Sequence, residues 1–525
     1  MRPLLRRATP TLALVTALLL AVALLPGPGA TGAAKTGVLD GSRSAATARE
    51  PGACEKLLSA PVEQLKGAPT RVETAAVVAA KGDLPEYCRV TGYVAPHQIR
   101  FELRLPTGSW NGGYYQTGCG GLCGNVPIEG CGTALGRGFA VAAENTGHTA
   151  DSQDALWAYG DKAAKAAFGY LSPHVVSVAG KALTKIYYGR AARHAVFEGC
   201  SNGGRQGIEV ASRHPEDFDG VIARDPVLHA PQVGMFYIWV TKVNRRAGGG
   251  TILPAQKLPL IHKAVVAACG GADGVIADPF RCGWDPGRIQ CKPGQGSATC
   301  LTAAQVDVVR KFYAGPSDSH GRALYPVDGK LRGLPVGALQ RGSELEWANP
   351  ALDLISAAPG KKAVAEIFAG GFYRYLLFAK DKGPTANYLD FDFDRDPGLL
   401  DNTYFGTGSR DLRAFHRAGG RLLLIQDLAD QAVPPTSTTT YYDESVAANG
   451  GGRAADSWMR LFTVPGTPHC DLVSSAPGVI DALTAMTQWI TRGQAPATLT
   501  AQQFDSAGHV TGRRTLTPYR STHHR

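Results

Sequence analysis

The sequence predicts an α/β fold in which helices cover both faces of a mostly parallel sheet, and an inserted domain interrupts the core. Three observations lead to this prediction. From about Leu84 to Pro226, short apolar runs alternate with helical stretches, a pattern typical of parallel sheets. Between roughly Leu228 and Asp396 this pattern changes. A serine flanked by glycines, Ser201, directly follows one of the apolar runs.

Apolar runs and periodic stretches place the elements of the core. The predicted buried strands are Phe139–Ala143, Ala195–Phe197, Val221–Ala223, Leu422–Ile425 and Leu461–Val464. The predicted helices are one or two within Ala163–Tyr188, one that begins with Arg205–Ser212, and a closing helix over Ile480–Thr491. The core is therefore expected in two parts, residues 45–228 and 397–525, with a lid domain over 229–396.

The predicted lid is too long to be a plain loop. Four cysteines fall within Cys269–Cys300, and Gly and Pro are dense. The aromatic residues that recur are Phe236, Tyr237, Trp239, Trp284, Trp347, Phe372, Tyr373 and Tyr375. We expect the lid to close an aromatic-lined pocket. At its end, Asp390–Asp394 alternates polar and apolar residues, which favours a half-buried strand over a run of metal ligands.

The first 34 residues predict a secretory signal peptide and hence a secreted protein. Three arginines precede an apolar run, Leu12–Leu25, and small residues continue to Ala34, which is the order of an export signal. A membrane anchor is the alternative, but the run is shorter than the roughly 20 residues that a spanning helix needs. We expect no membrane attachment after cleavage.

Composition excludes some classes of partner. The formal net charge is +10, but the basic residues are scattered and form no stripe, so nucleic-acid binding is not expected.

The 525 residues suffice for more than one domain. Eleven cysteines in an exported chain indicate disulfides, whose pairing the spacing alone leaves open.

The segment Gly199–Gly203 predicts a nucleophile elbow. It reads Gly-Cys-Ser-Asn-Gly, with a strand before it and a helix after it. A sharp strand-to-helix turn of this kind lifts the hydroxyl of Ser201 clear of the sheet. Arg205 and Gln206 are expected to tie the turn to the helix.

His469 is the best candidate for the base that Ser201 needs, since a serine hydroxyl is a weak nucleophile without one. It stands on a loop after the predicted strand Leu461–Val464. A cysteine adjoins each residue, because Cys200 precedes the serine and Cys470 follows the histidine. A disulfide between these cysteines would bring the serine and the histidine together.

Several stretches resemble the tannase and feruloyl esterase group of secreted serine esterases. They are Trp110–Gly113, Asn145–His148, Gly199–Gly207, His214–Gly220 and Val464–Cys470, in the order found in that family. The resemblance covers most of the mature chain. It implies an α/β-hydrolase core with an inserted lid, and a catalytic pattern of Cys-Ser, a lone Asp and His-Cys.

The resemblance also implies disulfide pairs. These are Cys54 with Cys88, Cys200 with Cys470, Cys269 with Cys282, and Cys291 with Cys300. The pairing of Cys119, Cys123 and Cys131 remains open: the alternatives are a free cysteine and a pair that staples the Gly-rich segment in which they lie. A zinc site from these three is disfavoured because no histidine shares their spacing.

The acid that orients His469 should follow the penultimate strand, Leu422–Ile425. In the family a His-Gly pair follows this strand, and the catalytic Asp comes later, before a proline-containing turn. Here Gln426 and Asp427 replace His-Gly, and Asp430 precedes a turn that contains Pro434. The resemblance thus favours Asp430 and leaves Asp427 as the competitor.

An oxyanion hole requires backbone N–H groups directed at the developing charge. One donor is expected from Asn202, the residue after the nucleophile. The other is expected from the Gly-rich segment Gly118–Gly121, where we favour Gly120 or Gly121.

No cofactor is expected to be required. The family holds calcium in its lid with two Asp-Gly steps after a cysteine. Here Cys269–Pro279 has only one such step, so Asp273 is a weak candidate ligand.

Together these features predict a secreted serine carboxylesterase that acts through an acyl-enzyme. The resemblance and the aromatic residues of the lid indicate feruloyl- or galloyl-type phenolic esters, either small molecules or esters linked to polysaccharide. Short aromatic diesters or monoesters of the synthetic-polyester type are an alternative. Outside this class, the candidates are a non-catalytic phenolic- or carbohydrate-binding protein on a hydrolase fold, and a serine peptidase of similar fold.

Overall fold

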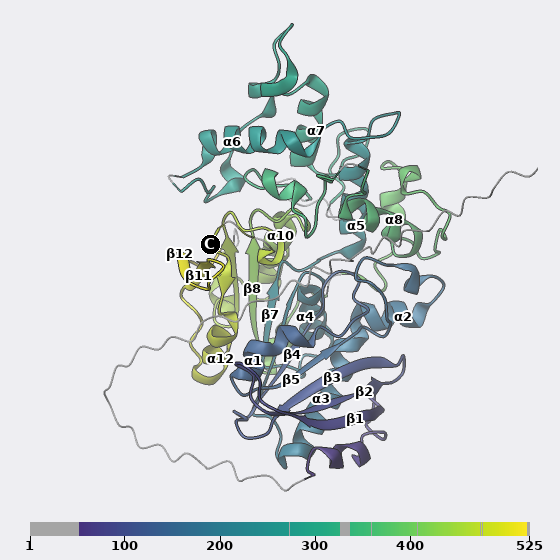
Figure 1. Cartoon of the computed structure of the whole chain (residues 1–525), viewed down its shortest axis with the longest axis vertical. Coiled ribbons are helices and arrows are strands. Elements are labelled where there is room, and N and C mark those ends of the chain that lie inside the picture. Colours follow the sequence, from purple (N-terminus) through teal and green to yellow (C-terminus); the bar gives the residue numbers. More distant parts are fainter. Residues whose placement is uncertain are drawn as a thin grey trace, which may run out of the picture.

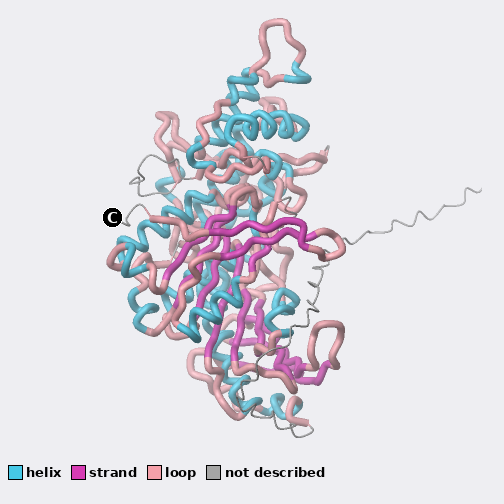
Figure 2. The backbone as a smooth tube through the Cα atoms, turned by 90° about the vertical axis from the view of Figure 1, so that its left-hand side faces the viewer, coloured by secondary structure: helices cyan, strands magenta, loops and turns pink. Residues whose placement is uncertain are grey.

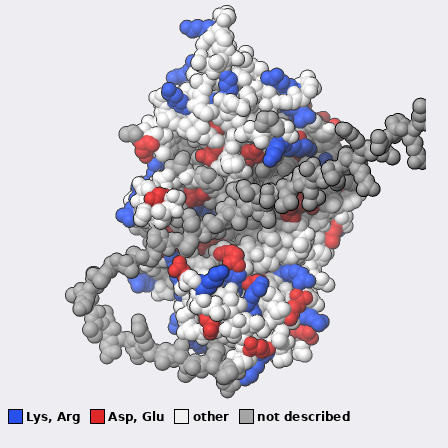
Figure 3. Space-filling view, in the orientation of Figure 1, with Lys and Arg blue, Asp and Glu red and all other residues white. Residues whose placement is uncertain are grey.

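A computed structural model describes residues 52–271, 273–325, 337–358, 360–406, 408–472, 474 and 476–521. The predicted signal peptide lies outside these residues. Within them, no helix combines the length and apolar character that crossing a membrane requires. On the face in Figure 3, Lys and Arg are interspersed with Asp and Glu, without a large patch of one sign.

A nine-stranded sheet runs through the centre of the core (Figures 1 and 2). Its order is β1-β2-β3-β5-β4-β6-β7-β8-β9. The first four strands in this order pair antiparallel, and from β5 to β9 every pairing is parallel. The strands are β1 Thr70–Val78, β2 Tyr87–Val94, β3 Ile99–Pro106, β4 Gly113–Thr117, β5 Ala140–Glu144, β6 His194–Cys200, β7 Gly220–Arg224, β8 Arg421–Asp427 and β9 Met459–Val464.

A second, antiparallel sheet comprises β10 Val479–Ile480, β11 Leu499–Phe504 and β12 Val510–Leu516. The α-helices are α1 Gly132–Gly136, α2 Lys162–Ala166, α3 Ser172–Tyr188, α4 Asn202–Arg213, α5 Ala230–Val243, α6 Leu258–Cys269, α7 Ala303–Ala314, α8 Val364–Tyr375, α9 Arg413–Arg417, α10 Pro435–Ala448, α11 Gly452–Ala455 and α12 Ala482–Arg492.

Helices cover both faces of the large sheet because successive residues of its strands point to opposite faces and are apolar on each face. In β8, Leu422 and Leu424 join a core cluster with residues of α3, α4 and α10. The intervening Leu423 and Ile425 join another cluster with residues of α1 and α12. Burial on both faces is the reason that these strands are continuous apolar runs.

The predicted strands correspond to β5–β9, and the predicted mostly parallel sheet is confirmed. The predicted helical stretch Ala163–Tyr188 corresponds to α2, which begins one residue earlier at Lys162, a π-helical segment over Ala167–Leu171, and α3. The closing helix is α12.

The prediction of a strand over Asp390–Asp394 is wrong. A 3-10 helix ends at Asp390, and the chain then turns. Side-chain carboxylates form these turns, since Asp392 accepts from the N–H of Asp394 and Asp396 accepts from the N–H of Asp392. The alternating pattern arises because Phe391 and Phe393 pack on the core of the lid.

Helices α5–α8 fall within the predicted lid and lie at one end of the molecule (Figure 1). They share a separate apolar core that contains Phe236, Trp284 and Trp347. Phe168 and Phe405, from outside residues 229–396, pack into the same cluster. The apolar core of the predicted lid is therefore continuous with side chains from outside residues 229–396.

Five disulfides join the described cysteines, and Cys131 is free and buried. Four of them are the pairs that the resemblance implies, and the fifth joins Cys119 to Cys123. These two cysteines are therefore not thiolates, and the alternative of a zinc site with Cys131 is ruled out.

The turn between β6 and α4 depends on close backbone packing. Ser201 has φ 60° and ψ −125°, a region that a residue with a side chain adopts only under constraint. A Cβ atom added at Gly199 would lie 2.5 Å from the carbonyl carbon of Gly203. Gly199 of the Gly-x-Ser-x-Gly pattern is thus required by backbone contact, and Gly203 is closely packed, since its added Cβ would lie 3.0 Å from the carbonyl carbon of Gly118.

Replacing Gly199 with alanine should destabilise the fold. Because the neighbouring atoms are backbone and cannot rotate away, we expect the free energy of unfolding to fall by about 1–3 kcal/mol. Chemical denaturation of Gly199→Ala measures this, with Gly130→Ala as control, since an added Cβ at Gly130 meets nothing within 4 Å. Equal stability of the two variants would contradict the packing account.

Candidate active site

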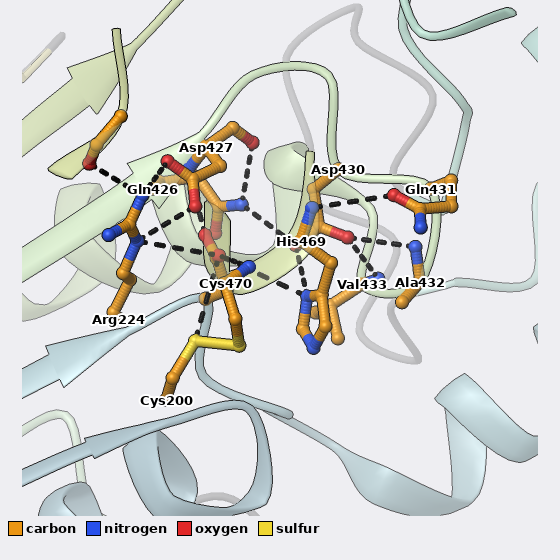
Figure 4. The surroundings of a disulfide bond; sticks show 12 residues. Cys200, Arg224, Gln426, Asp427, Asp430, Gln431, Ala432, Val433, His469 and Cys470 are labelled. Carbon is orange, nitrogen blue, oxygen red and sulfur yellow. Dashed lines mark hydrogen bonds and ion pairs between the residues drawn. A yellow bond between two sulfur atoms is a disulfide. The ribbon is translucent and has the colours of Figure 1, made fainter. Parts of the chain in front are cut away.

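The loop after β9 carries a buried histidine that an aspartate orients. His469 is 2 % exposed, and its Nδ1 lies 2.7 Å from Oδ2 of Asp430. The other carboxylate oxygen, Oδ1, accepts the backbone N–H groups of Ala432 and Val433 at 2.8 Å each (Figure 4). This geometry assigns the proton to Nδ1 and leaves Nε2 as the basic nitrogen.

A disulfide links this loop to the nucleophile elbow. It joins Cys200, just before Ser201, to Cys470, just after His469, with the two Cα atoms 5.9 Å apart. Nε2 of His469 is buried and meets no hydrogen-bond partner among the described residues. No hydrogen bond to Ser201 is formed, and catalytic hydrogen bonds of this kind commonly tighten only when substrate is bound.

Asp427, the competing acid, pairs with a different residue. Its two carboxylate oxygens accept Nε and Nη2 of Arg224 at 2.8 Å each, which is a bidentate ion pair. Arg224 and Asp427 end the neighbouring parallel strands β7 and β8. Asp427 thus has its partner in Arg224, and the structure brings Asp430, not Asp427, to His469.

The sequence did not suggest Asp225, a buried carboxylate near the histidine. Its Oδ2 accepts the N–H of Cys470 at 2.7 Å and lies 4.0 Å from Nδ1 of His469. Its position could have been a signal. Asp225 follows a predicted strand next to the nucleophile strand, and side chains at the carboxyl ends of parallel strands converge.

Two of the predicted oxyanion donors, Gly120 and Gly121, lie on the loop that the Cys119–Cys123 disulfide closes, whereas Asn202 begins α4. Among the described residues, the N–H groups of Gly120, Gly121 and Asn202 meet no acceptor, whereas those of Leu122 and Cys123 do. Gly121 and Asn202 line the same cavity as Ser201, and Gly120 does not. Gly121 is therefore the better supported of the two glycine candidates.

Side chains from α4 hold this loop. Nδ2 of Asn202 donates to the carbonyl of Cys119 at 3.2 Å and also contacts Cys123 Sγ at 3.2 Å. Oε1 of Gln206 accepts the N–H of Cys119 at 3.0 Å, and its Nε2 donates to Glu144 at 3.0 Å. Burial raises the pKa of Glu144 to about 7. Gln206 thus supports the turn, as the sequence predicts, whereas Glu144 is a buried partner that no sequence signal indicated.

A cavity beside Ser201 is lined almost entirely by apolar side chains. None of its described lining residues carries a charge. The lining is formed by Gly121, Leu122, Phe168, Ser201, Asn202, Val227, Ala230, Val233, Tyr237, Leu352, Phe368, Phe372, Leu376 and Phe405. Tyr237 and Phe372 come from the predicted lid, whereas Trp284 and Trp347 lie inside the lid core.

The residues around Asp273 do not fit a calcium ion. The Asp273 carboxylate accepts Nη2 of Arg514 at 2.8 Å and the N–H of Val275 at 3.0 Å. Asp278 accepts the N–H of Phe280 in the next turn. Calcium takes six to eight oxygen ligands, and no described group of acids gathers at Asp273.

This arrangement suits attack by an alcohol on a carbonyl carbon. An imidazole oriented by a carboxylate can take the proton of a serine hydroxyl. Backbone N–H groups on a fixed loop can hold the oxyanion that results.

Breaking the Cys119–Cys123 staple should lower turnover more than stability. We expect the Cys119→Ser/Cys123→Ser variant to lose about 10- to 100-fold in kcat toward an activated ester. This loss is smaller than the loss in kcat from removing one oxyanion donor, because the donor is displaced and not removed. KM should change little, because the hole binds the transition state. The matched control is Cys54→Ser/Cys88→Ser, which should lower the melting temperature at unchanged kcat. Equal kcat in both variants would exclude a positional role for the staple.

Comparison with known proteins is consistent with this chemistry. Residues 86–524 match the family described as tannase and feruloyl esterase. A mono(2-hydroxyethyl) terephthalate hydrolase from Piscinibacter sakaiensis is 32% identical over 496 residues, covering 82% of this chain and 80% of that protein. A probable feruloyl esterase from Arthroderma benhamiae is 31% identical over 429 residues, covering 78% and 76%.

Solved structures agree. Feruloyl esterase B from Aspergillus oryzae superposes with a TM-score of 0.76 at 25% identity, covering 89% of this chain and 95% of that one. Tannin acyl hydrolase from Aspergillus niger has a TM-score of 0.69 at 22% identity, covering 89% and 92%, and supports the fold. The predicted α/β-hydrolase fold is thereby confirmed. The chain belongs to the tannase and feruloyl esterase family and is a carboxylic ester hydrolase.

Proposed function

We propose that the protein is an exported serine esterase that cleaves uncharged esters of phenolic acids. Ser201 is the nucleophile, His469 the proton shuttle and Asp430 the orienting acid. The observation that carries this proposal is the 2.7 Å contact between His469 Nδ1 and Asp430 Oδ2, on a loop that a disulfide ties to the elbow serine.

The reaction proceeds in two halves. His469 Nε2 takes the proton of Ser201 as Oγ attacks the ester carbonyl, and Asp430 stabilises the imidazolium. The N–H groups of Gly121 and Asn202 hold the oxyanion. His469 then protonates the departing alcohol, which leaves an acyl-enzyme. In the second half, His469 activates water in the same way, and the free acid departs.

The cavity lining supports an uncharged aromatic acyl group. Phe168, Phe368, Phe372 and Phe405 offer aromatic surface, and aromatic rings pack well against each other. A carboxylate placed there would lose its hydration without gaining a cation among the described lining residues. Feruloyl-type esters and neutral aromatic diesters therefore fit better than a terephthalate monoester, although a relative is named for hydrolysing such a monoester.

Export is part of the proposal. Five disulfides in the described residues are typical of proteins that fold in an oxidising compartment. The leader predicted over residues 1–34 would direct the chain there.

A fluorophosphonate probe tests the nucleophile and separates an esterase from a binding protein. We expect stoichiometric labelling of the wild type at Ser201, found by peptide mass mapping, and none of Ser201→Ala, because only an activated serine reacts. The same substitution should abolish hydrolysis of methyl ferulate. Labelling at another serine, or none in the wild type, would overturn the assignment.

The choice between two acids is tested by a matched pair. Asp430→Asn should lower kcat about 100- to 10,000-fold, because the imidazole loses its orienting carboxylate. Asp427→Asn should leave kcat within about fivefold, since that carboxylate serves Arg224 rather than His469. Steady-state kinetics on methyl ferulate measure both. The reverse order of effects would make Asp427 the catalytic acid.

Two terephthalate methyl esters, one neutral and one charged, test the pocket. Dimethyl terephthalate and monomethyl terephthalate share the ring and the type of scissile methyl ester, of which the diester has two, but the second carries a free carboxylate at neutral pH. We expect kcat/KM to be at least about 100-fold higher for the diester, because the unpaired charge loses its solvation. Equal values would contradict an uncharged acyl pocket.

A further inference from the structure

Asp225 occupies a position between the ends of two strands and the histidine loop. It is fully buried and directly follows β7. Its Oδ1 accepts the N–H of Asp427, at the end of β8, at 2.7 Å, and its Oδ2 accepts the N–H of Cys470 at 2.7 Å. One carboxylate thus connects three segments that meet at the site.

The backbone that Asp225 holds is strained. Cys470 and Asp471 have φ values of 54° and 57°, and Asp225 itself has φ 42°. Non-glycine residues remain in this region only where their surroundings fix them. The bond from Cys470 N–H to Asp225 and the disulfide to Cys200 are two such constraints on the residue next to His469.

The charged groups that face Asp225 leave it without a cation of its own. Asp427 is paired with Arg224, whose Nε lies 4.0 Å from Asp225 Oδ2. Asp430 is bonded to His469 and to two backbone N–H groups. Burial, and then the neighbouring Asp427 and Asp430, raise the pKa of Asp225. Both its oxygens nevertheless accept N–H groups, which is the arrangement that holds a carboxylate.

The His469 imidazole has two carboxylates on one side. Nδ1 lies 2.7 Å from Asp430 Oδ2 and 4.0 Å from Asp225 Oδ2. The two acids come from the ends of neighbouring parallel strands, β7 and β8. A small tilt of the ring would exchange one acceptor for the other.

We propose that Asp225 is a second positioning acid for His469, which fixes the Cys470 backbone and accepts Nδ1–H when Asp430 is absent. This inference rests on the proposed role of His469 as the base. It predicts that Asp225 preserves part of kcat when Asp430 alone is lost, and that no acid does so when both are lost.

A double-mutant cycle on methyl ferulate tests this. Asp225→Asn keeps the shape of the side chain but sets an amide N–H against a backbone N–H, and should lower kcat about 10-fold with little change in KM. In an Asp430→Ala background the same substitution should lower kcat at least about 10-fold more than it does in the wild type, because the reserve acceptor is then lost. An equal factor in both backgrounds, or no effect in either, would overturn the proposal.

A spectroscopic measurement does not depend on activity or on the folding of Asp225→Asn. Proton NMR of Asp430→Ala should retain a downfield His469 Nδ1–H signal, as expected for an imidazole bonded to a carboxylate. Loss of that signal would show that Asp225 does not take over. Asp427→Asn, which removes a carboxylate from the same cluster, is the matched control and should leave the wild-type signal in place.

These outcomes are separable from failure of the proposed function. If the wild type is labelled at Ser201 and hydrolyses the ester while Asp225→Asn behaves like the wild type, only the inference about Asp225 fails. If the wild type is not labelled, the proposed function fails.

Discussion

The disulfide between Cys200 and Cys470 is the constraint on which the site depends. It joins residues 270 positions apart in the sequence, and closing so long a loop stabilises the fold by about 5 kcal/mol in the chain-entropy view. Its two ends are the immediate neighbours of the proposed nucleophile, Ser201, and the proposed base, His469. Ser201 and Cys470 both have positive φ, so the disulfide fixes the position of two strained turns relative to each other.

The electrostatics of the site follow from the same meeting of strand ends. Three carboxylates are buried where β7 and β8 finish, a situation that is costly unless each is partnered. Asp427 has the Arg224 guanidinium, Asp430 has the imidazole and two N–H groups, and Asp225 has two N–H groups. In this arrangement Asp430 takes the Nδ1–H of His469, whereas Arg224 and His469 each lie 4.0 Å from Asp225. The ion pair with Arg224 also explains how Asp427 can lie near the site without displacing Asp430 from His469.

Local signals in the sequence predicted strands β5–β9, the elbow and the histidine, because each depends on a few neighbouring residues, but they did not predict β1–β4 or the second sheet. These signals could not predict contacts between residues that are distant in the sequence. Asp225 acquires its place only when β7 lies beside β8 and the Cys470 loop returns to both. Spacing could not decide among Cys119, Cys123 and Cys131. The alternation in Asp390–Asp394 misled because two phenylalanines can pack on a core without any neighbouring strand.

The most direct test of the clamp is the Cys200→Ala/Cys470→Ala variant, assayed beside its unfolding curve. With a positional role for the disulfide, kcat toward methyl ferulate should fall at least about 100-fold, since reacting groups that drift by about an ångström lose rate steeply. Far-ultraviolet circular dichroism should still report a folded protein at the assay temperature. A folded variant with the kcat of the wild type would contradict the account.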